Sequence, residues 1–207
     1  MKTSSFKAPF ISIDEIWVKA DKFREEFWDK DCPVDIFAIV EFDLDLSILP
    51  ISGLKTDVDA DALLLGDLKT IAVDNEEYLR ESYQNRLRFS FAHEIGHLVL
   101  HKNIFSKIKY SSLEEYIQYF SGLPEDQYSW IEYHANEFAG RLLVPKEKLI
   151  KSLNRTIKKA EIKGFNEWDS SGESALEYVS HNIAKDFGVS EQVIKIRLIK
   201  EKLWLPK

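Results

Sequence analysis

The sequence of 207 residues contains a single cysteine, Cys32, so it can form no internal disulfide bond. This scarcity is typical of proteins from a reducing compartment. It also excludes a cysteine-rich zinc site, because such a site needs several thiolates. Any metal ion bound by this chain must therefore be held by histidine and carboxylate side chains.

Long apolar stretches are absent as well. The first 17 residues contain no apolar segment of the kind found in secretion signals, and no run approaches the roughly 18 apolar residues needed to cross a bilayer. We therefore expect a cytoplasmic protein that does not enter the membrane. The content of 44 % apolar residues is enough for a sizeable core, and the length fits one domain with at most a small appendage.

Basic residues are in the minority, and the net charge of -7 argues against general adhesion to nucleic acid. The charge is unevenly distributed along the chain. Residues 146–207 carry 13 Lys and Arg against 9 Asp and Glu, whereas residues 1–145 carry 15 against 26. We interpret the basic C-terminal part as a solvated helical surface, and the alternative is a docking face for an acidic or nucleic-acid partner.

Internal repeats and low-complexity runs are missing too, and the apolar periodicity predicts helices packed around a small sheet. Ser12 and Ser112 each begin a capping box. Alternating apolar residues predict a strand over 44–48 that Pro50 ends, and two strands within 61–75 that are joined by a Gly-Asp pair. The expected helices cover residues 12–28, 33–40, 83–101, 111–120, 129–144, 146–153, 174–187 and 190 onward.

Only five histidines occur, and three of them lie in the segment SFAHEIGHLVLH. On the helix predicted there, His93 and His97 project from one face about 6 Å apart along the axis, a span that one zinc ion can bridge. Glu94 is turned about 100° away, which keeps its carboxylate off the metal but near enough to take a proton from water. This HExxH spacing on an amphipathic helix is typical of zinc hydrolases, and the alternative is a chance match on an ordinary helix.

His101 continues the same row of histidines but lies about 12 Å from His93 along a straight helix. One ion with ligands at about 2 Å cannot bind both residues. We expect His101 to support a metal ligand or the packing at the helix end, where a protonated imidazole also suits the helix dipole.

The third ligand must come from elsewhere, and the segment WIEYHANEFAGRLLVP offers Glu132, Glu137 and His134. A helical wheel places Glu132 and Asn136 on one face and His134 on the opposite face. Glu132 is favoured because Asn136, one turn further on, could orient a metal ligand. Small residues on this helix also permit a close approach to the HExxH helix, namely Ala135, Ala139 and Gly140. The alternative for Glu132 is a surface carboxylate.

The two segments RFSFAHEIGHLVLH and EYHANEFAGRLLVP resemble the ImmA/IrrE family of zinc metallo-endopeptidases, whose signature is an HExxH helix followed by an ExxAN.FA..LL.P helix. The resemblance covers about residues 30–150. It implies an α+β fold in which a small antiparallel or mixed sheet lies beside a helical bundle, close to the thermolysin-like (zincin) plan. It also implies Zn2+ bound by His93, His97 and Glu132, with Glu94 as the catalytic base. One departure is the stretch of 34 residues between His97 and Glu132, which concerns the rim of the site.

The resemblance further implies that the chain cleaves a specific protein, namely a DNA-binding repressor or an antitoxin encoded beside it. Because a single helix precedes Pro33, we expect this repressor to be a separate protein and not a fused domain. The alternative is a regulatory or toxin-like module that contacts protein or DNA and keeps a vestigial metal site. Residue type leaves open which donor would stabilise the oxyanion, the candidates being Tyr128, Tyr133, Arg141 and His181.

The segment IAKDFGVSEQVIKIRL near the C-terminus suits a helix-turn-helix, with Gly188 in the turn and Ser190 as N-cap. Its reading face would be modest, consisting of Gln192, Lys195 and Arg197. We therefore favour packing or partner docking over direct contact with DNA. The expected organisation is a metallopeptidase domain over 1–150 and a C-terminal helical extension over 151–207 that packs on it.

Overall fold

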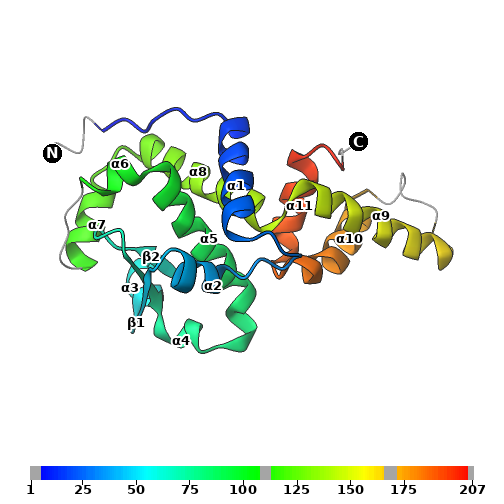
Figure 1. Cartoon of the computed structure of the whole chain (residues 1–207), viewed down its shortest axis with the longest axis horizontal. Coiled ribbons are helices and arrows are strands. Elements are labelled where there is room, and N and C mark those ends of the chain that lie inside the picture. Colours follow the sequence, from blue (N-terminus) through cyan, green and yellow to red (C-terminus); the bar gives the residue numbers. More distant parts are fainter. Residues whose placement is uncertain (1–5, 108–112, 166–171, 205–207) are drawn as a thin grey trace.

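The structure, a computed structural model, describes residues 6–107, 113–165 and 172–204. Helices make up most of it, and a small sheet lies at one end (Figure 1). The expected α+β fold, with a small mixed sheet beside a bundle of helices, is confirmed. Within the described ranges, no helix has both the length and the apolar character needed to span a bilayer.

The order of elements along the chain places the sheet before the two motif helices. The helices are α1 (Ile13–Phe27), α2 (Ile36–Ala38), the π-helical turn η2 (Ile39–Asp43), α3 (Leu54–Val58), α4 (Asn75–Tyr78), the 3-10 turn η3 (Glu81–Tyr83), α5 (Gln84–Leu100), α6 (Lys102–Phe105), α7 (Leu113–Ser121), α8 (Glu125–Leu143), α9 (Lys146–Ile162), α10 (Gly172–Phe187) and α11 (Glu191–Lys200). The strands are β1 (Ser47–Ile51), β2 (Ala62–Leu64) and β3 (Thr70–Asp74).

The sheet has the order β1-β3-β2, so β3 is central. β1 pairs with β3 in parallel and β2 pairs with β3 antiparallel, with Leu63 opposite Ala72. The turn between β2 and β3 is held by Asp67, whose Oδ1 accepts the backbone N–H groups of Lys69 and Thr70 at 2.8 and 3.0 Å. The predicted strand pair is thus confirmed, and it leaves β2 as an edge strand next to α5.

Two elements before this hairpin differ from the prediction. The strand expected over 44–48 is wrong by three residues, because β1 runs from Ser47 to Ile51 and includes Pro50. Pro50 is tolerated because β1 is an edge strand, where a residue without an N–H group can face the open side. The helix expected from Pro33 begins only at Ile36, because the Asp35 side chain caps it by accepting the Ala38 N–H at 3.2 Å.

The remaining predicted helices are confirmed, with shifted ends. α1 has Ser12 as its N-cap, and α8 begins one turn earlier than expected, after Pro124. α9 extends to Ile162 and not to residue 153, because its buried stripe continues through Thr156 and Ala160. The capping box predicted at Ser112 lies outside the described residues.

The C-terminal helices α10 and α11 pack against each other as the predicted hairpin. Gly188 between them has a φ of +59°, and a Cβ at this position would lie 3.0 Å from Arg88 Nε and 3.3 Å from Pro33 Cβ. The turn therefore needs a glycine both for its backbone and for its packing. One apolar core cluster includes residues on both sides of position 150, so the division into two parts stays a prediction.

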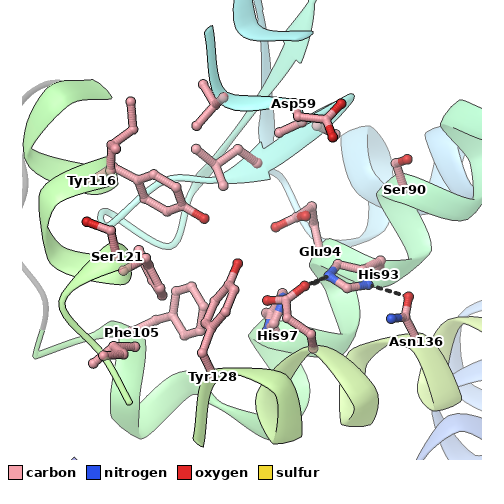
Figure 2. Close-up of a pocket in the computed structure, with 18 of the residues that line it drawn as sticks. Asp59, Ser90, His93, Glu94, His97, Phe105, Tyr116, Ser121, Tyr128 and Asn136 are labelled. Atoms are coloured by element: carbon pink, nitrogen blue, oxygen red, sulfur yellow. Dashed lines mark hydrogen bonds and ion pairs between the residues drawn. The ribbon is translucent and has the colours of Figure 1, made fainter. Parts of the chain in front are cut away.

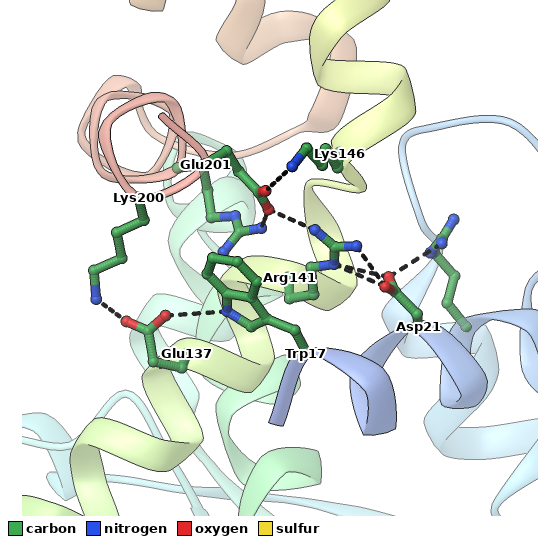
Figure 3. A network of polar contacts seen from close by, with 9 residues as sticks. Trp17, Asp21, Glu137, Arg141, Lys146, Lys200 and Glu201 are labelled. Carbon is green, nitrogen blue, oxygen red and sulfur yellow. Dashed lines mark hydrogen bonds and ion pairs between the residues drawn. The ribbon is translucent and has the colours of Figure 1, made fainter. Parts of the chain in front are cut away.

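A buried polar network joins α8 to α1 and α11 (Figure 3). Arg141 donates to Asp21 of α1 through Nε at 2.9 Å and to Glu201 after α11 through Nη1 at 2.5 Å. Glu201 also pairs with Arg197, whose guanidinium lies 4.7 Å from the Trp17 ring centre. Because the side chain of Glu201 is fully buried, these partners are needed to offset the loss of its hydration.

Candidate metal centre

Helix α5 turns its two motif histidines away from its apolar stripe, as the 3.6-residue period predicts. Leu87, Phe91 and Ile95 on the stripe are fully buried in the core. The opposite face is not solvated, however, because His97 is only 3 % exposed. This face lines a cleft between α5, α8 and the segment that contains α6 and α7 (Figure 2).

The close approach of α5 to α8 depends on Gly96, which lies between the two histidines. A Cβ at this position would lie 3.1 Å from both the Cα and the carbonyl oxygen of Ala135, and 3.3 Å from Phe138 Cβ. Two helices approach this closely only where one of them lacks a side chain at the contact. The contact fixes α8 one turn beyond Glu132, and so it determines where the Glu132 carboxylate lies.

Glu132 lies next to the two motif histidines. Its Oε2 is 3.2 Å from His93 Nε2 and its Oε1 is 3.4 Å from His97 Nε2, while the two Nε2 atoms are 2.9 Å apart. One ligand atom from each residue lies within 4.8 Å of the others, so the cluster could hold a metal ion. Two ligands at about 2.1 Å from a tetrahedral ion are about 3.4 Å apart, which is close to the observed spacings.

Charge as well as position suits these groups to a cation. Burial alone would raise the pKa of Glu132, but the neighbouring imidazoles of His93 and His97 hold it well below its usual range. Glu132 is therefore an ionised carboxylate at neutral pH, facing two ring nitrogens. An anionic oxygen and two imidazole nitrogens form a donor set that suits a borderline-soft divalent ion.

The other candidates for the third ligand point elsewhere. His134 faces His101, with 3.2 Å between its Nδ1 and His101 Nε2. Glu137 accepts a hydrogen bond from Trp17 Nε1 at 3.3 Å and pairs with Lys200. Neither side chain belongs to the cluster around His93.

Both motif histidines have a partner on the ring nitrogen that faces away from the cluster. Asn136 Oδ1 lies 3.0 Å from His93 Nδ1, and His101 Nδ1 lies 3.1 Å from His97 Nδ1. A ring that donates Nδ1–H to such a partner keeps the Nε2 lone pair free for a metal. Both partners therefore favour the tautomer that a metal ligand needs.

The protonated state expected for His101 is wrong. This residue is only 1 % exposed, and burial, together with the neighbouring rings of His97 and His134, lowers its pKa to about 2. His101 is therefore neutral, with one ring nitrogen that accepts and one that donates. A neutral ring can accept the Nδ1–H of His97, whereas an imidazolium could not.

Glu94 lies on the same helix but forms no part of the three-residue cluster. Its Oε2 accepts the backbone N–H of Leu64 in β2 at 2.7 Å, which holds the side chain in a fixed orientation. Burial raises the pKa of Glu94, although His93, His97 and the Leu64 N–H act against this effect. The carboxylate points into the cleft beside His93 (Figure 2).

Of the four candidate oxyanion donors, Tyr128 is the one that lines this cleft. Its hydroxyl points into the space near Glu94 and His97 (Figure 2). Burial, followed by the negative charge of Glu132, raises its pKa, so the hydroxyl keeps its proton and remains a donor. Arg141 is engaged in the network of Figure 3, and the exposed His181 pairs with Glu191 at 2.6 Å.

Some residues of the site are not apparent from the sequence. Gly96 stands inside the HExxH motif, and its absence of a side chain is the signal on that helix that another helix crosses there, alongside the small residues of the partner helix. Leu64, which holds Glu94, and Tyr116, which lines the cleft from α7, have no local signal, because only the fold brings them to the motif helices.

Comparison with known protein families gives a match. The model of the Peptidase_M78 family, described as the IrrE N-terminal-like domain, matches residues 79–199. This range includes both motif helices and continues through most of α11. A search of the curated proteins finds no match. Because the family model covers more than half of the chain, the protein belongs to the Peptidase_M78 (IrrE N-terminal-like) family of peptidases.

Proposed function

We propose that this chain is a zinc-dependent endopeptidase whose ion is bound by His93, His97 and Glu132. The observation that carries the proposal is the convergence of their three donor atoms beside the buried Glu94. Two neutral imidazoles and one carboxylate leave a net charge of about +1 and a fourth position open to the cleft. A zinc ion held there would polarise a peptide carbonyl and lower the pKa of a water molecule to about 7.

In this proposal Glu94 moves the protons. It takes one from the attacking water and passes it to the nitrogen of the leaving peptide. Burial raises the pKa of this carboxyl group, which makes it a stronger base toward the proton of the water than an exposed carboxylate would be. The Leu64 N–H keeps one of its oxygens occupied, so the other remains for the water.

Three further residues have supporting roles. The Tyr128 hydroxyl, which points into the cleft, donates a hydrogen bond to the oxyanion that forms at the carbonyl. Asn136 and His101 orient the rings of His93 and His97 through the hydrogen bonds to their Nδ1 atoms.

The substrate in this proposal is a separate protein, either a DNA-binding repressor or an antitoxin. Support comes from the resemblance of the two motifs to the ImmA/IrrE endopeptidases and from the family match. The rival is a regulatory binding module with a structural metal site. Such a site would fill its fourth position with a protein ligand and would need no base, whereas Glu94 lies buried beside this cluster.

The decisive experiment mixes the zinc-loaded protein with the repressor encoded beside its gene, with and without a chelator, and follows the repressor by mass spectrometry. We expect cleavage that the chelator stops. Glu94→Gln should bind zinc as the unaltered protein does but leave the repressor whole. Glu147→Gln is the matched control, because Glu147 is exposed on α9 and does not line the cleft. A repressor that stays whole in every mixture would favour the binding module, and cleavage by Glu94→Gln would remove Glu94 from the mechanism.

A further inference from the structure

The cleft of about 550 Å³ extends well beyond the metal-binding cluster. Figure 2 shows His93 and Glu94 on one side of it, and Tyr116 and Phe105 on the other. A volume of this size is in the range of about 300–1,000 Å³ that is typical of ligand sites. Space for a substrate side chain is therefore present next to the reacting groups.

Aromatic rings form a continuous wall from the cluster to α7. The Phe105 ring centre is 5.0 Å from that of His97 and 5.7 Å from that of Phe120. The Phe120 ring is in turn 4.4 Å from Tyr116 and 5.7 Å from Tyr128. All four aromatic residues come from the segment between His97 and Glu132, so this segment builds a side of the cleft.

The facing wall is also apolar. It is formed by residues from the end of α3 through β2, namely Val58, Ala60, Ala62 and Leu63, with the charged Asp59 among them. Between the two walls, an apolar side chain would exchange water for aromatic and aliphatic contacts, which is the main favourable term in such binding.

The charged residues around the cleft are of one sign. Among the described residues that line it, Lys and Arg do not occur, and the acidic residues are Asp59, Glu94, Glu125 and Glu132. An acidic side chain placed here would lose water and lie near the carboxyl groups of Glu94 and Glu125, and the described lining residues offer it no Lys or Arg.

We propose that this recess, walled by Phe105, Tyr116, Phe120 and Ala60, receives a large apolar side chain of the substrate residue next to the cleaved bond and rejects an acidic one. This inference rests on the proposed function, because it takes the cluster beside the recess as the place of peptide cleavage. Burial of a Leu or Phe side chain in such a recess favours binding over an Ala side chain by about 10- to 100-fold.

Short peptide hydroxamates test the recess without any cleavage. Their hydroxamate group binds zinc, and the adjoining residue can be Phe, Leu, Ala or Asp on one common backbone. Calorimetry with the zinc-loaded full-length protein should give Kd values for Phe or Leu that are about 10- to 100-fold lower than for Ala, with Asp the weakest. Equal Kd values across the series would overturn the recess proposal alone. Binding of none of the four would overturn the metal centre, and with it the proposed function.

Substitutions in the recess supply the second measurement. Ala60→Leu should fill it and weaken the Phe hydroxamate about tenfold while leaving the Ala hydroxamate within about twofold. Phe120→Ala should widen it and reduce the preference for Phe over Ala. Tyr119→Ala is the matched control, because Tyr119 is the neighbouring aromatic residue of α7 and does not line the cleft. Circular dichroism identifies a variant that fails to fold, and an unchanged preference in a folded Ala60→Leu protein contradicts the proposal.

Discussion

Replacing Gly96 by alanine would test whether the approach of α5 to α8 determines the metal centre. The added methyl group would lie 3.1 Å from the backbone of Ala135 and 3.3 Å from Phe138 Cβ. Backbone atoms cannot turn aside as a flexible side chain can. The helices would therefore have to separate by a few tenths of an ångström, and Glu132 would move with α8.

Two effects of this substitution have opposite signs. Alanine in place of glycine within a helix raises the free energy of unfolding by about 1 kcal/mol. An extra methyl group in a tightly packed contact lowers it by about 1–3 kcal/mol. Because the contacts of Gly96 are with backbone, we expect a net loss of about 1–2 kcal/mol. Metal ligands tolerate displacements of only about 0.2 Å, so zinc affinity should fall by about 10- to 100-fold.

Urea denaturation of the metal-free protein measures the first quantity, and competition with a chromogenic chelator measures the second. Gly140→Ala is the matched control within α8. Its Cβ would meet the Arg197 side chain, at 3.2 Å, and no atom of α5, so it should lower zinc affinity much less. If Gly96→Ala matched the unaltered protein in unfolding free energy and in zinc affinity, the argument from helix approach would be wrong.

The remaining predictions concern catalysis, stability and acid sensitivity. Tyr128→Phe should lower kcat for repressor cleavage by about 10²- to 10³-fold while zinc stays bound; an unchanged kcat would remove this hydroxyl from the mechanism. Arg141→Met should lower the free energy of unfolding by about 3 kcal/mol, because it breaks a buried network. Arg155→Met is the control at the more exposed pair with Asp186, and it should lower the free energy of unfolding by less than about 1 kcal/mol. Burial would raise the pKa of Asp74, but hydrogen bonds from the backbone N–H groups of Lys55, Glu76 and Glu77 outweigh this effect and lower the pKa. The stability that Asp74 contributes is therefore complete above about pH 4 and is lost as the pH falls further. Urea titrations of Asp74→Asn should show a deficit at pH 7 that shrinks below pH 4; a deficit independent of pH would contradict this.

The sequence predicts those parts of the site that depend on local geometry. His93 and His97 are four residues apart on a helix, and this spacing alone brings their rings together. The helical wheel separates Glu132 from His134 for the same reason. What it cannot provide is the contact of Gly96 with Ala135, because the distance between two helices depends on tertiary packing.

Other expectations depended on the environment of a residue, and here sequence reasoning was less successful. The spacing of His101 predicts that it is too far from His93 to share an ion with it, and His101 is not part of the cluster of His93, His97 and Glu132. The helix end alone favours a protonated His101, whereas burial beside His97 and His134 makes it neutral. Pro50 was expected to end a strand, but its position at the sheet edge removes the conflict.

The C-terminal helices have a physical connection to the metal centre, which fits a family match that continues to residue 199. Glu137 and Arg141 lie on α8 five and nine residues beyond Glu132, and both are held by residues in or after α11. Trp17 of α1 links the two helices, because its Nε1 donates a hydrogen bond to Glu137 of α8 and its ring contacts the guanidinium of Arg197 of α11. Helix α8 also carries Glu132, Asn136 and the contact with Gly96. A displacement of α11 would therefore be passed to these residues through the ion pairs of Glu137 and Arg141. The orientation of Glu132, the proposed carboxylate ligand, therefore depends on the C-terminal helices as well as on the two motif segments.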